Sequence, residues 1–179
     1  MTAIHGERVT LRPFRPDEVE LALAREPSED PERREARRAR IALSGTRTAW
    51  EILFAVEAEG RLVGDIQARC SDQAMPPGVW EIGVDLWEPA DRGHGLGTEA
   101  VRLLTAHVFA REGAHRVQAT TDVANAAMRR SLEKCGFAYE GDLRGYMPVA
   151  DGPARDYAMY ATTIGAPRAE LGSSSASGA

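Results

Sequence analysis

The chain has 179 residues, a formal net charge of −5, 43% hydrophobic residues and 27% charged residues. This length and composition are typical of one globular domain with a buried core. The acidic balance excludes a general basic surface, so nucleic acid is not an expected partner. No apolar run approaches the roughly 18 residues of a membrane span, and no leader pattern begins the chain. We therefore expect a cytoplasmic protein that does not bind a membrane.

The two cysteines, Cys70 and Cys135, lie far apart in the sequence and lack CxxC spacing. A disulfide framework or a zinc site needs more cysteines at closer spacing, so neither is expected. Two reduced structural thiols in a reducing compartment are predicted instead. We assign no metal site.

Hydrophobic periodicity predicts the elements of the first half of the chain. Alternating residues over 8–14 predict a strand that prolines close. Prolines in the first turn begin two helices, over 16–25 and 28–43, and Ser28 or Asp30 caps the second. The second helix is expected to bury a stripe formed by Ala36, Ala39 and Leu43.

Three strands are predicted next, over residues 51–58, 62–68 and 79–86. In the third, strict alternation separates two faces. The apolar face carries Trp80, Ile82, Val84 and Leu86, and the other face carries Glu81, Gly83 and Asp85.

The second half of the chain alternates helices and strands. The strongest helix is expected over 96–111, and another over 125–135, with Asn125 or Asp122 as its cap. Short strands are expected over 115–121, 137–143 and 155–162.

This order predicts an α/β fold in which a mixed sheet packs against helices. One domain is expected over residues 1–164. The Gly/Ser/Ala-rich segment 165–179 is expected to be a disordered tail.

A glycine-rich segment joins the third of these central strands to the strongest helix. Gly93, Gly95 and Gly97 lie between the strand and the helix, and Arg92 precedes them. Glycines allow the backbone to approach a ligand closely, and the first N–H groups of a helix lack intrahelical partners. Together they suit a phosphate or a pyrophosphate.

Two phosphate-binding motifs do not fit this segment. A P-loop needs a lysine, which is missing here, and a dinucleotide fingerprint needs a third glycine where Thr98 stands. A glycine-rich turn without a ligand remains the alternative for this loop taken alone.

The sequence resembles the GNAT acyltransferases at two motifs. Arg92, Gly95 and Gly97 fit the family's (Q/R)xxGx(G/A) signature, and residues 125–137 are similar to its Asn-x-Ala…EKxGF helix. Further similarities indicate the RimJ/RimL-like branch of ribosomal-protein N-acetyltransferases: Val9 to Arg12, Glu140-Gly141 and Asp156-Tyr157.

The resemblance, which covers about residues 7–163, implies a mostly antiparallel sheet in which a splayed strand pair holds acetyl-CoA. The backbone of Leu86 and Trp87 would pair with the pantetheine arm. Asn125 would contact the pantetheine or the adenosine-phosphate side, and Arg130 would reach a phosphate. The pyrophosphate would be held by Arg92, Gly93, His94, Gly95, Leu96, Gly97 and Thr98.

The reaction implied is direct attack of a primary amine on the acetyl thioester, without a covalent acetyl-enzyme. The branch's serine and carboxylate positions hold Met128 and Met147, and the tyrosine of other branches is replaced near Glu133. Those catalytic roles therefore do not carry over. Glu81 is the best remaining general base, because it lies on the strand that leads to the loop; a solvated strand carboxylate is the alternative.

Other residues carry weaker hypotheses. Tyr146 and Asp156 are candidates for substrate or proton roles, although Asp156 is better explained as a structural hydrogen-bond partner. His107 is expected to be a structural histidine. The arginine-rich run 33–40 is expected to be a solvated, ion-paired helix face, or else to border the acceptor site.

Two functions compete at this point. The first is an acetyl-CoA-dependent N-acetyltransferase whose acceptor is a protein N-terminus or a small-molecule amine. The second is a catalytically weak acyl-CoA-binding module of the same fold, which Met128 and Met147 motivate. Related folds often dimerise, so a homodimer is also considered, although no stripe in the sequence identifies an interface.

Overall fold

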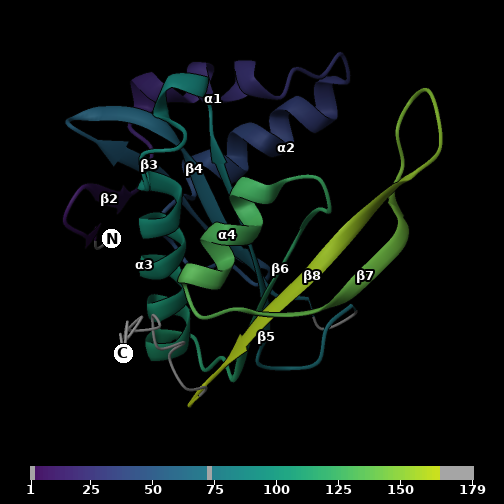
Figure 1. The fold of residues 1–179 in the computed structure, drawn as a ribbon. Coiled ribbons are helices and arrows are strands. Elements are labelled where there is room, and N and C mark those ends of the chain that lie inside the picture. The colour runs from purple at the N-terminus through teal and green to yellow at the C-terminus, as the bar shows by residue number, and fades with distance from the viewer. Residues whose placement is uncertain (1–2, 72–73, 166–179) are drawn as a thin grey trace, which may run out of the picture.

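The computed structural model describes residues 3–71 and 74–165 (Figure 1). Apart from Gly165, the segment expected to form a disordered tail lies outside the described residues. In the described part of the chain, no helix has the length and apolar character needed to cross a membrane.

Within the described residues, eight strands form one sheet in the order β1-β2-β3-β4-β5-β6-β8-β7. The strands are β1 (Ile4–His5), β2 (Val9–Arg12), β3 (Glu51–Ala58), β4 (Arg61–Arg69), β5 (Val79–Leu86), β6 (Arg116–Asp122), β7 (Ala138–Met147) and β8 (Arg155–Thr163). The α-helices are α1 (Val19–Arg25), α2 (Pro31–Ala42), α3 (Leu96–Arg111) and α4 (Ala126–Lys134). Short 3-10 turns cover Pro16–Glu18 and Pro89–Asp91.

The β5–β6 pair is the one parallel pair among the described strands. Its register starts with Val79 beside Arg116 and ends with Glu81 beside Gln118. Both strands continue beyond this point without pairing to each other. The mixed, mostly antiparallel sheet and its splayed strand pair are therefore confirmed.

Helices cover both faces of the sheet. The larger core joins α3, through Ala100 and Leu104, to sheet residues such as Phe54 and Trp80. A smaller cluster joins α1 and α2 to Leu53. Because Leu53 and Phe54 are consecutive in β3, their side chains point to opposite faces. In Figure 1, α3 and α4 cross in front of the strands, whereas α1 and α2 lie further back.

Most predicted elements are confirmed to within a few residues, and β5 and α3 have the predicted bounds. The two-residue strand β1 was not predicted, because it is too short to show a period. The predicted stripe of α2 is wrong: Ile41 is buried, whereas Ala36 and Ala39 are exposed and Leu43 is 53% exposed. Leu43 lies past the end of the helix, at its C-cap. Because α2 has so few apolar residues, the segments that it packs against, and not its own hydrophobic pattern, determine which of its faces is buried.

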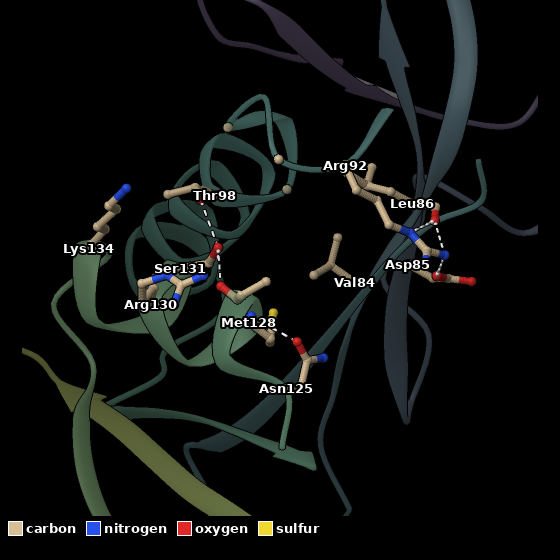
Figure 2. A pocket seen from close by; sticks show the side chains of 14 residues that line it. Val84, Asp85, Leu86, Arg92, Thr98, Asn125, Met128, Arg130, Ser131 and Lys134 are labelled. Atoms are coloured by element: carbon tan, nitrogen blue, oxygen red, sulfur yellow. Dashed lines mark hydrogen bonds and ion pairs between the residues drawn. The ribbon is translucent and has the colours of Figure 1, made fainter. Parts of the chain in front are cut away.

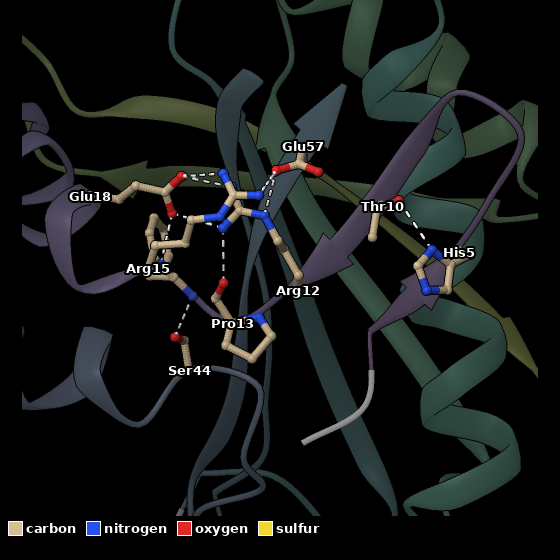
Figure 3. Close-up of polar contacts among 9 residues, drawn as sticks. His5, Thr10, Arg12, Pro13, Arg15, Glu18, Ser44 and Glu57 are labelled. Carbon is tan, nitrogen blue, oxygen red and sulfur yellow. Dashed lines mark hydrogen bonds and ion pairs between the residues drawn. The ribbon is translucent and has the colours of Figure 1, made fainter. Parts of the chain in front are cut away.

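A buried ion-pair network fastens β2 to its neighbours (Figure 3). The Arg12 guanidinium donates two bonds of 2.7 Å to Glu18 and one of 2.7 Å to Glu57. Arg15 reaches the same two carboxylates from the exposed side, at 3.4 and 2.7 Å. The resemblance singled out the Val9 to Arg12 segment, and this network shows that Arg12 has a structural role there.

Candidate active site

A cavity of about 420 Å³ lies between the end of β5 and the facing parts of α3 and α4 (Figure 2). Eight residues predicted to bind the cofactor line it: Leu86, Arg92, Gly93, Gly95, Gly97, Thr98, Asn125 and Arg130. The other lining residues are Val84, Asp85, Ala127, Met128, Ser131 and Lys134. Segments up to 50 residues apart in sequence therefore meet at this cavity.

The glycine loop presents backbone donors to this cavity. Gly93 and Gly95 have φ angles of 81° and 85°, in the left-handed region that favours glycine. Gly95 is the N-cap of α3 and provides no side chain to cap it. The first N–H groups of α3 are thus left for a ligand, and the helix dipole adds partial positive charge.

Hydrogen bonds join the start of α3 to α4 beside the cavity. Thr98 Oγ1 donates to Ser131 Oγ at 3.0 Å, and Ser131 Oγ donates in turn to the Ala127 carbonyl at 3.0 Å. Cys135 Sγ donates to the Thr98 carbonyl at 3.2 Å. Burial raises the pKa of the Cys135 thiol to about 11, so it remains protonated and is a poor nucleophile.

Beyond its pairing with β6, β5 has backbone N–H and C=O groups that point toward the cavity. Trp87 N donates to Val63 O at 3.0 Å, on the β4 side. Because backbone groups alternate in direction along a strand, those of Leu86 and Val84 point the opposite way. In agreement, Arg92 Nε and Nη2 donate to Leu86 O at 2.9 and 2.7 Å. This carbonyl lies where the resemblance places the pantetheine arm.

Three predicted cofactor residues do not line the cavity. The Trp87 ring stacks on Phe14 at 6.3 Å between centroids, on the α1–α2 side of the sheet. His94 lines a separate hollow and accepts a hydrogen bond from Arg8 at its carbonyl. Leu96 is 7% exposed and belongs to the main core. These three residues therefore contact parts of the protein outside the cavity and hold the loop and the strand in place.

Asn125 lines the cavity at the start of α4 (Figure 2). Its Oδ1 accepts from Met128 N at 3.0 Å, so its side chain caps α4 as predicted. With the carbonyl oxygen occupied, the carboxamide NH₂ is the group suited to a ligand, and it can only donate.

Glu81 lies where β5 and β6 separate, outside the cavity lining. Its carboxylate accepts from Arg69 Nη2 at 3.0 Å and from Gln118 Nε2 at 3.4 Å. The side chain is 17% exposed, so it is not the fully solvated carboxylate of the alternative interpretation.

Other candidates from the sequence have structural partners. Asp156 Oδ1 accepts from Gly145 N at 2.7 Å, and Tyr146 lies beside Tyr157 on the exposed β7–β8 hairpin. Burial lowers the pKa of His107, whose ring lies nearly perpendicular to that of Phe54. The arginine-rich run is ion-paired, through Glu20, Glu26, Asp30, Glu35 and Glu51.

Asp65 was not among the predicted site residues, although this carboxylate is close to the site. It lies on β4 directly opposite Asp85, and its Oδ2 accepts from Trp87 Nε1 at 2.9 Å. Burial raises the pKa of Asp65; the Trp87 hydrogen bond lowers it, and nearby Asp85 raises it further. An acidic residue between the apolar residues Val63 and Ile66 of β4 was the signal for it.

Asp65→Asn is expected to stabilise the protein at neutral pH. The pKa of Asp65 is raised in the fold, so the folded state holds its proton more tightly, and stability falls as pH rises above about 3.9. Asparagine removes this cost and still accepts the Trp87 bond. Thermal melts of both proteins should differ at pH 8 and converge near pH 3.5. The exposed Asp151→Asn variant serves as control, and a difference independent of pH would contradict the prediction.

Comparison with known proteins identifies the family. The profile described as acetyltransferase (GNAT) domain matches residues 8–138, which include the glycine loop and all of α4. A search of curated proteins found no significant match.

Solved acetyltransferases have a similar fold. RimL, a ribosomal L7/L12 α-N-protein acetyltransferase in complex with coenzyme A, is 18% identical with a TM-score of 0.72, over 93% of this chain and 100% of that one. The Salmonella typhimurium acetyltransferase that modifies the N-terminal serine of ribosomal protein L7/L12 is 17% identical with a TM-score of 0.72, over 91% and 99%. Mycobacterium smegmatis RimJ, in complex with a CoA-disulfide, is 26% identical with a TM-score of 0.67, over 87% and 81%.

The splayed strands, the glycine loop and the family match agree. They favour an enzyme that uses acetyl-CoA over the catalytically weak binding module and over a glycine turn without a ligand. The chain belongs to the GNAT family of acetyltransferases.

Proposed function

We propose that this acetyltransferase binds acetyl-CoA in the cavity between β5, α3 and α4 and acetylates the α-amine of a protein N-terminus. The observation that carries the proposal is the cavity itself, which opens between a bare helix N-terminus and the free edge of β5. The protein acceptor is supported by the RimL neighbour, an α-N-protein acetyltransferase, and by the Salmonella typhimurium enzyme that modifies the N-terminal serine of ribosomal protein L7/L12.

The residues present fit the cofactor. The open N–H groups from Gly95 to Thr98, with Arg92, would hold the pyrophosphate. Leu86 backbone groups would meet the pantetheine arm, Asn125 would donate to it from α4, and Arg130 would face a phosphate. Trp87, His94 and Leu96 would keep the strand and the loop in position.

When bound, acetyl-CoA supplies its acetyl group as a thioester. A cleft-facing backbone N–H at Val84 or Leu86 would stabilise the negative charge that develops on the carbonyl oxygen. Glu81 would accept the proton that the attacking amine loses, directly or through a water molecule. The leaving thiolate would take a proton from water.

Acetyl-CoA is expected to stabilise the fold, whereas NAD at the same concentration is not. At about 100 times the dissociation constant, linkage gives roughly 2.7 kcal/mol of stabilisation, which a thermal melt detects. Thiol release with N-terminal peptides and with small amines then tests the acceptor. No stabilisation by acetyl-CoA would contradict the cofactor assignment, and turnover of small amines alone would contradict the protein acceptor.

Gly95→Ala is expected to weaken acetyl-CoA binding by about 5- to 30-fold. A left-handed alanine costs about 1–2 kcal/mol, so the loop relaxes and binding must restore its shape. Calorimetric titration measures the loss. Gly60→Ala is the matched control, because Gly60 has a similar φ of 74° but lies in the β3–β4 turn, away from the cavity. Equal affinity of the Gly95→Ala protein and the wild type would contradict a phosphate-binding role for the loop.

A further inference from the structure

Three arginines of α2 line a separate cavity of about 430 Å³, which we call the α2 cavity. Arg33, Arg37 and Arg40 follow one another at spacings of four and three residues, so they share one face of the helix. The other lining residues are Glu26, Pro27, Ser28 and Ala36. Three guanidinium groups and one carboxylate therefore line this cavity, although the chain as a whole has a net charge of −5.

The ion pairs of these arginines leave bonding capacity for an anionic ligand. Arg33 lies 3.3 Å from Asp30, but both side chains are exposed, and such a surface pair contributes little free energy. Arg37 pairs with the exposed side chain of Glu26. Among the described residues, Arg37 Nε is buried without a hydrogen-bond partner. Because an unsatisfied buried donor is unfavourable, a ligand carboxylate that replaces Glu26 and also reaches Nε would bind well.

The α2 cavity adjoins the part of the sheet that carries Glu81. Arg40 donates from Nη2 to the side chain of Gln67, which lies directly opposite Gly83 on β5. Apart from the chain neighbours of Gly83, only the Gln67 side chain among the described residues lies within 4 Å of the position that a Cβ would occupy there. Alternation along β5 places Glu81 and Gly83 on the face of Trp87, which packs with α1 and α2 (Figure 1). A peptide can therefore approach the β5 backbone beside Glu81 from the α2 side.

The spacing of the arginines matches an extended peptide. Arg33 and Arg40 are seven positions apart, which is about 10 Å along the helix at roughly 1.5 Å per residue. An extended chain covers that length in about three residues, at roughly 3.3 Å each. A peptide with its terminal amine at Glu81 would therefore pass its next residues along Arg40, Arg37 and Arg33 in turn.

Aspartate and glutamate side chains are the groups of a polypeptide that guanidinium forks bind most strongly. We propose that the α2 cavity binds acidic side chains that follow the reacting N-terminus, so that the enzyme prefers acceptors with aspartate or glutamate at about positions two to five. The inference rests on the proposed function, because it places the reacting amine beside Glu81.

Two peptides that differ only in charge test the proposal. The acceptors are Ser-Asp-Glu-Asp-Glu-Ala and Ser-Asn-Gln-Asn-Gln-Ala, which have nearly the same shape, and thiol release from acetyl-CoA measures kcat and KM for each. The acidic peptide should have a kcat/KM about tenfold or more higher, mainly through a lower KM, because charge-assisted hydrogen bonds are strong. This preference should decrease as salt increases.

Variants of α2 assign the preference to the cavity. Arg33→Gln should reduce the preference for the acidic peptide about two- to fivefold, and Arg33→Gln/Arg40→Gln should remove it. Arg33→Glu should reduce it more than Arg33→Gln does, because it adds repulsion. Arg38→Gln is the matched control: Arg38 belongs to the same helix and pairs with Glu20, but it lies outside the cavity lining, so the full preference should remain. Thermal melts check folding, and the exposed Arg33 provides a single-site test if the double variant does not fold.

Two outcomes would overturn this proposal and leave the acetylation of protein N-termini intact. The first is an equal kcat/KM for the acidic and the neutral peptide in the wild type. The second is a preference that the double variant and both Arg33 variants retain in full, because it would then arise elsewhere on the protein. Acetylation of small amines but of neither peptide would overturn the protein acceptor itself, and this proposal with it.

Discussion

Replacing Glu81 with glutamine is expected to lower kcat by about 10²- to 10⁴-fold and to leave acetyl-CoA affinity unchanged. Glutamine retains one oxygen that can accept from Arg69, as Glu81 Oε1 does at 3.0 Å, and it gives up the longer bond from Gln118 to Oε2, so the local structure should survive. It cannot take a proton from the amine. Because Glu81 lies outside the cavity lining, the loss should appear in turnover and not in cofactor binding.

The structure offers a close control for this experiment. Glu51 and Glu81 flank Arg69 in register across three strands, and their side chains are 15% and 17% exposed. Glu51→Gln removes a similarly buried, ion-paired carboxylate from the same face of the sheet. It should retain kcat within about twofold.

Thiol release measures turnover in the wild type and in both variants. Unchanged turnover in the Glu81→Gln variant would remove Glu81 from the mechanism without removing the enzyme. Asp85 and Asp65, which lie on the same face of β5 and β4, would then be the next candidates for the general base.

Arg12→Met is expected to lower the free energy of unfolding by about 3–5 kcal/mol. Arg12 is 8% exposed and holds Glu18 and Glu57 together (Figure 3). Without it, two carboxylates face each other with only the half-exposed Arg15 between them. Urea denaturation measures the loss.

Arg116→Met is the control for this loss. Arg116 also pairs with a carboxylate, but its partner Glu140 is 40% exposed, so about 1 kcal/mol or less is expected. Similar losses in the two variants would contradict the importance of the buried network.

At low pH, the wild type and Arg12→Met should differ less in their free energy of unfolding. Burial raises the pKa of Glu18, but the bonds from Arg12 and from Arg15 N outweigh it, and the pKa is lowered overall. A lowered pKa means that the carboxylate stabilises the fold above its ordinary value of 4.5. This contribution is lost as pH falls through the folded value. The difference between the two proteins should therefore narrow below about pH 4.5.

The amino-acid sequence by itself determined the secondary-structure elements and the position of the glycine loop. Local signals were sufficient there: β5 alternates strictly, α3 has helical spacing, and three glycines stand between them. Asn125 is likewise a local cap, set by the residues that follow it. Such features depend on neighbours within a few positions, which the sequence shows directly.

Only the tertiary structure decided which side chains meet. The register of β4 on β5 brings Asp65 beside Asp85, and the docking of α4 on α3 turns Lys134 toward the cavity. The packing of distant segments also placed Trp87 and His94 outside the cavity. It likewise left the predicted stripe of α2 exposed. The direction of a side chain depends on how distant segments pack, and no local pattern encodes that packing.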